Sequence, residues 1–167
     1  IGTSMAGLWG CLAAGTIFTQ IRFQFGKPLF HNQGISFVLA EHYAKTMALT
    51  SFAFQIADFY DMKIARKIHA NEVPSSLDEG TAALMASEGK YLLAKQLADT
   101  SYEISQLMGG RGTIDEVGSN NRMAHGADLA RIAEVVGGHR NVQLMIVESG
   151  LKAMSAMAMD QFVKKAK

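Results

Sequence analysis

Apolar residues return at steps of three and four positions along most of this chain, and short segments with glycine, asparagine or proline separate these stretches. Such spacing is typical of helices that bury one face. No alternating Val/Ile/Thr-rich run is present, so we expect an all-α fold, an antiparallel four-helix bundle with an extra short helix. The predicted helices cover residues 3–23, 33–69, 76–108 and 122–136, and a last one from the Gly137-Gly138 pair to the C-terminus.

Three breaks separate the long helices, and we place them at residues 25–32, 70–76 and 109–121. In the first break, Gly26 turns freely and Pro28 lacks a backbone donor. In the second, Pro74 ends the preceding helix. Ser76 is predicted to cap the next helix, with Glu79 returning a hydrogen bond to the Ser76 amide. The third break opens on a glycine-rich turn that suits the end of a helix.

The first 21 residues carry no charge, and their length would be enough to span a bilayer. Four glycines and several polar residues lower their hydropathy, and no basic segment precedes them, so we predict no membrane span. We expect a helix that other helices bury on most sides. Any part left uncovered would favour self-association.

Composition narrows the classes of protein that fit. Apolar residues make up 49% and charged residues 19%, which indicates one globular domain over residues 1–167. The net charge is +1 without a basic stripe, so we expect no nucleic-acid partner. Cys11 is the one cysteine, which favours a reducing compartment. The histidines form neither a His-x-x-x-His nor a Glu-x-x-His pair, so no metal is expected.

Four segments, in the same order along the chain, resemble the motifs of one enzyme family. Residues 22–29 read R-F-Q-F-G-K-P-L and match R-x-x-F-G-K-P-L. Residues 32–41 match H-Q-x-I-S-F-x-L-A-E, with Asn32 in place of the histidine, and residues 106–112 match Q-x-x-G-G-x-G. Residues 143–147 are similar to the start of the final helix. These segments identify a resemblance to the C-terminal helical domain of the acyl-CoA dehydrogenases.

The resemblance implies one part of a longer FAD-dependent enzyme that oxidises an acyl-CoA thioester across its α and β carbons. The bundle would form part of the acyl pocket, contact FAD and join subunits into a homodimer or homotetramer, with electron-transfer flavoprotein as a further partner. It implies a cytoplasmic or mitochondrial-matrix location, and this segment alone is expected to be inactive. The cofactor-binding residues carried over by the resemblance are Arg22, Gln24, Phe25, Asn32, Gln33, Gln106, Gly109, Gly110, Gly138 and Asn141.

One position departs from the family pattern. Many members have their catalytic glutamate just before the last helix, and Gly137 stands there in this chain. The base is then expected upstream of Ile1, as in other branches of the family, or at Glu134, one helical turn before Gly137. Two alternatives stay open. The chain could be a paralogue without α,β-dehydrogenation activity, or an unrelated helical interaction module.

Overall fold

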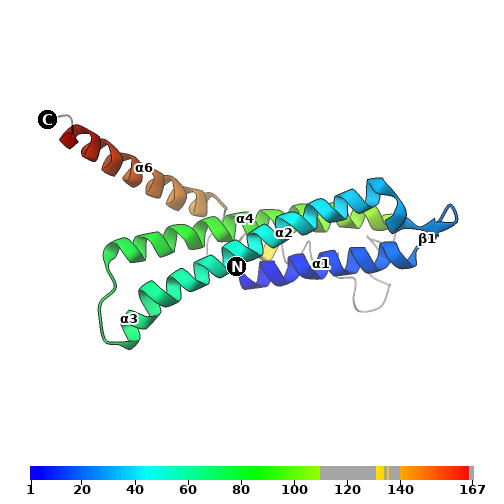
Figure 1. Ribbon diagram of the computed structural model, residues 1–167, viewed down its shortest axis with the longest axis horizontal. Helices are drawn as coiled ribbons and strands as arrows, with labels where there is room; N and C mark the ends of the chain where they lie inside the picture. Colours follow the sequence, from blue (N-terminus) through cyan, green and yellow to red (C-terminus); the bar gives the residue numbers. More distant parts are fainter. Residues whose placement is uncertain (110–130, 134, 136–139, 166–167) are drawn as a thin grey trace.

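The computed structural model of the chain describes residues 1–109, 131–133, 135 and 140–165, and nearly all of them are helical (Figure 1). The predicted short helix and the loop before it lie almost entirely outside the described residues. The elements are α1 (Gly2–Ile21), β1 (Phe23–Gln24), β2 (Lys27–Pro28), the 3-10 turn η1 (Leu29–His31), α2 (Gln33–Tyr60), the π-helical turn η2 (Asp61–Ala65), α3 (Arg66–His69), α4 (Ser76–Met108) and α6 (Arg140–Lys165).

Helices α1, α2 and α4 lie along one another, and α2 runs in the opposite direction to the other two (Figure 1). Helix α4 contacts each of the other long helices, including the first part of α6. The far part of α6 extends away from the other helices (Figure 1). The all-α fold is therefore confirmed, with α1, α2 and α4 as its packed body.

The core forms where these three helices meet. Its buried apolar side chains are Leu8, Cys11, Leu12, Leu39, Ala53, Leu93, Leu97 and Ile104. On α1, the buried positions follow the three- and four-residue steps of the sequence pattern, so one face of this uncharged helix is covered, and not most of its sides as expected; Ile17 and Ile21 stay exposed. None of the described helices has both the length and the apolar content that a bilayer crossing requires.

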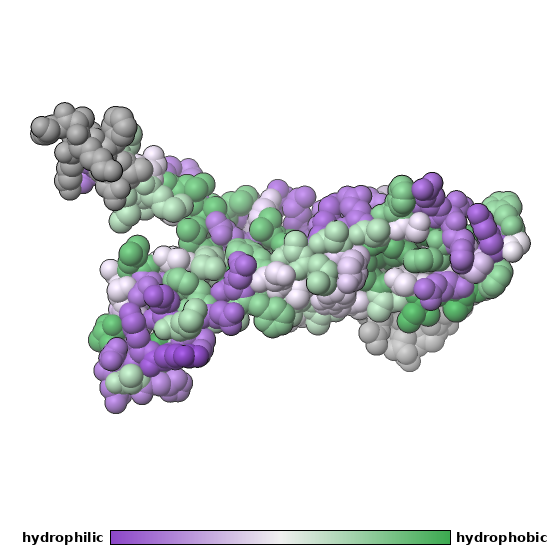
Figure 2. Space-filling view, in the orientation of Figure 1, coloured by the Kyte–Doolittle hydropathy of each residue, from purple (hydrophilic) through white to green (hydrophobic). Residues whose placement is uncertain are grey.

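Much of the apolar surface that remains exposed lies on α6 instead of α1. Figure 2 shows apolar residues along α6 where it leaves α4. Their exposed side chains are Val142, Leu144, Met145, Ile146, Leu151, Met154, Met157 and Met159. Self-association stays a prediction, but the exposed apolar surface that would drive it lies more on the last helix than on the first.

The first predicted break contains an antiparallel ribbon that the pattern of apolar residues did not indicate. Phe23 pairs with Pro28 and Gln24 with Lys27. The two residues between the strands, Phe25 and Gly26, have φ angles of 53° and 78°. Two consecutive left-handed residues are what a tight two-residue hairpin turn needs. Strands of two residues are too short to leave a period-two signal in the sequence.

The second predicted helix runs from residue 33 to residue 69 as expected, but one turn of π-helix, η2, interrupts its regular hydrogen bonding. A π turn holds one more residue than an α turn, so it rotates the face of every later side chain. Ile64 is buried within this turn, while Ile68 beyond it is 55% exposed although it continues the apolar stripe in the sequence.

The predicted cap of α4 was wrong by one residue. Ser75, and not Ser76, is the N-cap, because its side chain accepts a hydrogen bond from the Asp78 N–H at 3.1 Å. The Ser75 hydroxyl also donates to the Asp78 carboxylate at 2.7 Å, in place of the return bond expected from Glu79. Lys67 of α3 lies 3.0 Å from the same carboxylate. Both contacts, that of Ser75 first, lower the pKa of Asp78.

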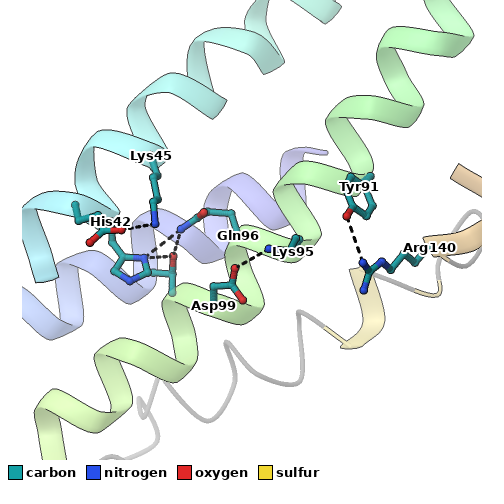
Figure 3. A network of polar contacts seen from close by, with 9 residues as sticks. His42, Lys45, Tyr91, Lys95, Gln96, Asp99 and Arg140 are labelled. Carbon is teal, nitrogen blue, oxygen red and sulfur yellow. Dashed lines mark hydrogen bonds and ion pairs between the residues drawn. The ribbon is translucent and has the colours of Figure 1, made fainter. Parts of the chain in front are cut away.

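A small group of buried and half-buried polar side chains joins α2 to α4 (Figure 3). His42 Nδ1 lies 2.9 Å from Thr100 Oγ1 and 3.1 Å from Gln96 Nε2, and the Gln96 amide donates to Thr100 Oγ1 at 3.0 Å. His42 is only 4% exposed. Its burial, and then Lys45, lower its pKa below the ordinary histidine value, against the opposing effects of Glu103, Glu41 and Asp99. A neutral ring is therefore favoured in the folded chain.

The tight contact of α1 with α4 predicts the effect of substitutions at glycine. A Cβ atom at Gly15 would lie 2.3 Å from Ile104 Cγ2, and Ile104 is fully buried. We expect Gly15→Ala to lower the free energy of unfolding by about 1–3 kcal/mol, because an overpacked core must shift. Gly80→Ala on α4 is the matched control, since no atom of the described part of the chain lies within 4 Å of that position. It should be neutral or stabilise by up to about 1 kcal/mol. Equal urea midpoints for both variants would contradict this packing.

His42 gives the stability a pH dependence of known sign. Because its pKa is lowered in the folded chain, the unfolded chain binds a proton first as pH falls below about 6.5. The free energy of unfolding should therefore decrease as pH drops from that value towards the folded-state pKa. His42→Gln should flatten this part of a stability profile measured by urea unfolding. His69→Gln, which replaces an exposed histidine, should keep the slope. An unchanged slope in His42→Gln would count against this assignment.

Candidate functional site

Most of the predicted cofactor residues lie at one end of the bundle. The ribbon joins the end of α1 to the start of α2, and α4 ends beside it (Figure 1). Phe30 and Ile35 from the start of this region, and Leu107 and Met108 from the end of α4, pack against the same core. The predicted residues gathered at this end, which we call the ribbon end, are Arg22, Gln24, Phe25, Asn32, Gln33, Gln106 and Gly109.

Backbone hydrogen bonds hold Arg22 in place, and its side chain remains available to bind a ligand. Its N–H donates to the Phe18 carbonyl at 3.0 Å and ends α1, while its own carbonyl accepts from the Leu29 N–H at 2.8 Å. The guanidinium is exposed and has no hydrogen bond or ion pair within the described part of the chain. Beside it, Gln24 is exposed and Phe25 is 93% exposed. A planar cation and an uncovered aromatic ring on one short ribbon suit a phosphate-bearing aromatic ligand.

The start of α2 adds two amide side chains. Asn32 occupies the N-cap position, and its carbonyl accepts from the N–H groups of Ile35 and Ser36, but its side chain makes no capping bond. Gln33 follows it and is exposed. Neither amide side chain has a hydrogen bond to a described residue, so Gln33 does not act as the helix cap. Both remain able to donate and accept.

The end of α4 supplies Gln106 and Gly109. The Gly109 N–H donates to the Gln106 carbonyl, and Gly109 has a φ of 60° and a ψ of −145°. That conformation favours glycine, and no described residue has an atom within 4 Å of where a Cβ would stand. The backbone at Gly109 is therefore open to the approach of another molecule, although the same glycine also ends the helix. Gly110 lies outside the described residues.

The start of α6 lies elsewhere. Arg140 Nη2 is 3.4 Å from the Tyr91 hydroxyl, and the Arg140 guanidinium is 5.5 Å from the centre of the Tyr91 ring (Figure 3). Tyr91 is near the middle of α4, about 27 Å along the helix axis from Gly109. Asn141, next to Arg140, is therefore not brought to the ribbon end. Glu134, Gly137 and Gly138 lie outside the described residues.

Two further groups bear on chemistry. Burial raises the pKa of Cys11 to about 11, so at neutral pH it is a thiol packed in the core and no nucleophile. No three His, Cys, Asp or Glu side chains gather into a metal site within the described ranges.

The sequence interpretation missed the contact of His42 with Gln96 and Thr100, since His42 counted only as one position of an apolar stripe. The signal available was the Gln96–Thr100 pair, four residues apart on one helix face.

One family model and several solved structures are similar to this chain. A model described as acyl-CoA dehydrogenase, C-terminal domain, matches residues 2–152. Butyryl-CoA dehydrogenase from Megasphaera elsdenii is similar with a TM-score of 0.69 and 24% identity, over 89% of this chain and 33% of that one. A putative acyl-CoA dehydrogenase from Mycobacterium smegmatis gives a TM-score of 0.70 and 18% identity, over 89% and 34%.

A structure described as the FAD complex of PigA gives a TM-score of 0.67 and 15% identity, over 89% of this chain and 34% of that one. No curated protein sequence matches. The chain thus spans about one third of the length of the similar structures. Because the family model covers most of the chain, the chain belongs to the acyl-CoA dehydrogenase C-terminal domain family.

Proposed function

We propose that this chain is the C-terminal helical part of an FAD-dependent acyl-CoA dehydrogenase, in which it holds FAD, walls part of the acyl pocket and joins subunits. The observation that carries the proposal is the ribbon end, where the residues matching the family motif are exposed together. The family match supports the same reading. Since the similar structures are about three times as long, the oxidation of acyl-CoA belongs to the longer protein and not to these residues alone.

The residues at the ribbon end fit FAD. The Arg22 guanidinium would bind the diphosphate through charge-assisted hydrogen bonds, and Gln24 would add a polar contact beside it. Phe25 offers an exposed ring for a flat group of the cofactor. The amides of Asn32 and Gln33 suit the polar edges of the adenine and ribose. None of these side chains would first have to break a contact with a described residue.

The other predicted contacts are backbone and small-residue contacts. At Gly109 the open space where a Cβ would stand lets the chain approach the cofactor closely, and we extend this role to Gly110. Gln106 lies one turn earlier on α4. Asn141, at the start of α6 and away from the ribbon end, would also contact FAD, and we extend this role to Gly138.

The flavin would accept the β hydride while a carboxylate removes the α proton of the acyl-CoA. Gly137 has no group that can take a proton, so we propose that the base is carried by a residue upstream of Ile1, with Glu134 as its rival. The partners we propose are the acyl-CoA substrate, further copies in a homodimer or homotetramer, and electron-transfer flavoprotein as electron acceptor. The proposed location is the cytoplasm of a bacterium or archaeon, or the mitochondrial matrix.

Gly137 also supports a second candidate function, a family member that keeps FAD but does not dehydrogenate acyl-CoA. The two candidates differ in one measurement. In an acyl-CoA dehydrogenase, the bound flavin loses its oxidised absorbance when an acyl-CoA is added. In a paralogue without the activity, the flavin stays oxidised although the protein is yellow.

Arg22→Ala should weaken FAD retention in the full-length protein. A hydrogen bond to a charged group contributes about 1.5–3 kcal/mol, which corresponds to roughly a ten- to hundred-fold loss of affinity. The measurement is the ratio of flavin to protein absorbance after extensive dialysis. Arg66→Ala is the matched control, because Arg66 is an exposed arginine paired with Asp61 at the other end of the body. Equal flavin content in both variants would show that Arg22 is a solvated surface charge with no role in FAD binding.

Glu134→Gln tests the position of the base. General-base catalysis contributes about 10²- to 10⁴-fold to a rate, so loss of the true base should almost abolish flavin reduction. We expect only a small change in the rate of flavin reduction by acyl-CoA, followed by stopped-flow absorbance in the full-length enzyme. Glu148→Gln, an exposed carboxylate on α6, provides the control. A fall of several orders of magnitude in Glu134→Gln alone would make Glu134 the base.

A further inference from the structure

The first part of α6 packs against α4 in one register. Arg140 contacts Tyr91, while Gly150, further along α6, faces Leu84, earlier on α4, so the two helices run antiparallel. The helices lie close together at Gly150, because a Cβ atom there would be 2.9 Å from Leu84 Cδ1. With Gly150 opposite Leu84, each step forward along α6 matches an equal step back along α4.

Both helices carry a stripe of positions along this contact, at alternating steps of three and four residues. The six positions on α6 are Arg140, Gln143, Val147, Gly150, Met154 and Met157. The six positions opposite them on α4 are Ala94, Tyr91, Ser87, Leu84, Gly80 and Leu77. The first four pairs lie in the contact, and Gln143, Ala94 and Ser87 among them are buried. This spacing is typical of two helices that pack side by side over several turns.

The last two pairs of positions are not covered. Helix α6 leaves α4 beyond Gly150 (Figure 1), and Figure 2 shows a notch between α6 and the body with apolar residues on both sides. Met154 and Met157 are 51% and 59% exposed, and Leu77 is 67% exposed. No described residue has an atom within 4 Å of where a Cβ at Gly80 would stand. The two stripes therefore continue for about two helical turns beyond the point at which the helices part.

A bend in α6 at one place would bring the uncovered stripes together. Ser149 and Gly150 stand where α6 leaves α4. Sharp kinks in helices occur at few kinds of site, and a pair of glycine and serine is one of them. A bend at this pair moves the far part of α6 and leaves the contact of Arg140 with Tyr91 in place. Helix α6 thus has a fixed first part and a second part that can turn towards α4.

We propose that the far part of α6 is a strap that closes onto the start of α4, where Met154 packs over Gly80 and Met157 packs against Leu77. The same chain is the favoured occupant, since the formed half of the stripe holds the other half at a roughly millimolar effective concentration. Burial of apolar side chains drives closure, and the unbranched methionine fits the surface at a glycine. Closure covers part of the apolar surface that would drive self-association, so the two compete. It does not depend on FAD or acyl-CoA.

The test is a disulfide across the notch. The double variant Leu77→Cys/Met157→Cys of the full-length protein is equilibrated with reduced and oxidised glutathione. Two cysteines can be bridged only when their Cα atoms come within about 7 Å, so a bond within one chain reports the closed strap. The matched control is Leu77→Cys/Met159→Cys, since Met159 is equally exposed but lies about 200° around the helix from Met157. Cys11 is buried with its pKa raised to about 11, so it does not compete.

We expect the effective concentration of the two thiols to be at least ten-fold higher in the Met157 pair than in the control, with the linked peptides identified by mass spectrometry. Equal values in the two pairs, or no disulfide within one chain, would overturn the proposal. A disulfide that joins two chains instead would assign the stripe to a second copy and would also overturn closure. Sedimentation velocity tests the competition. The oxidised Met157 pair should self-associate less than the same protein after reduction, and equal association would contradict this part.

Discussion

The close approach of α1 to α4 is the contact on which the rest of the structure depends. Gly15 and Gly7 on α1 face Ile104 and Leu97 on α4, and a Cβ at either glycine would lie 3.0 Å or less from the facing side chain. Small residues let the two helix axes come close, so that the branched side chains of α4 fill the space. Helix α4 then offers its other sides to α2 and α6. Among the long helices that the structure describes, α4 packs against each of the others.

This contact also determines where the candidate cofactor residues lie. Because α1 and α4 run in the same direction and pack along their length, both end at the same end of the body (Figure 1). The ribbon after α1 and the glycine turn after α4 are therefore neighbours although about 80 residues separate them in sequence. The left-handed Phe25 is unfavourable by about 1–2 kcal/mol, yet it is the conformation that presents the ring outward on the ribbon.

The contact of α2 with α4 is of another kind, since it holds buried polar groups. His42, Gln96 and Thr100 satisfy one another, whereas Thr46 Oγ1, one turn further along α2, is buried with no partner in the described residues. An unsatisfied hydroxyl of this kind costs about 1–3 kcal/mol. Polar groups make this interface more sensitive to pH than the apolar α1–α4 contact.

Local chemistry explains what the sequence determined by itself. Three- and four-residue periodicity predicted the helices that the structure describes up to residue 108, because burial of one helix face requires apolar side chains at that spacing. Glycine and proline residues predicted the first two breaks between them. The motif of residues 22–29 indicated Arg22, Gln24 and Phe25 by resemblance, without their geometry.

Only the tertiary structure decided the rest. The π turn, the cap at Ser75 and the ribbon depend on backbone hydrogen bonds that periodicity does not encode. The meeting of His42 with Gln96 and Thr100 depends on helix packing that joins residues 54 and 58 positions apart.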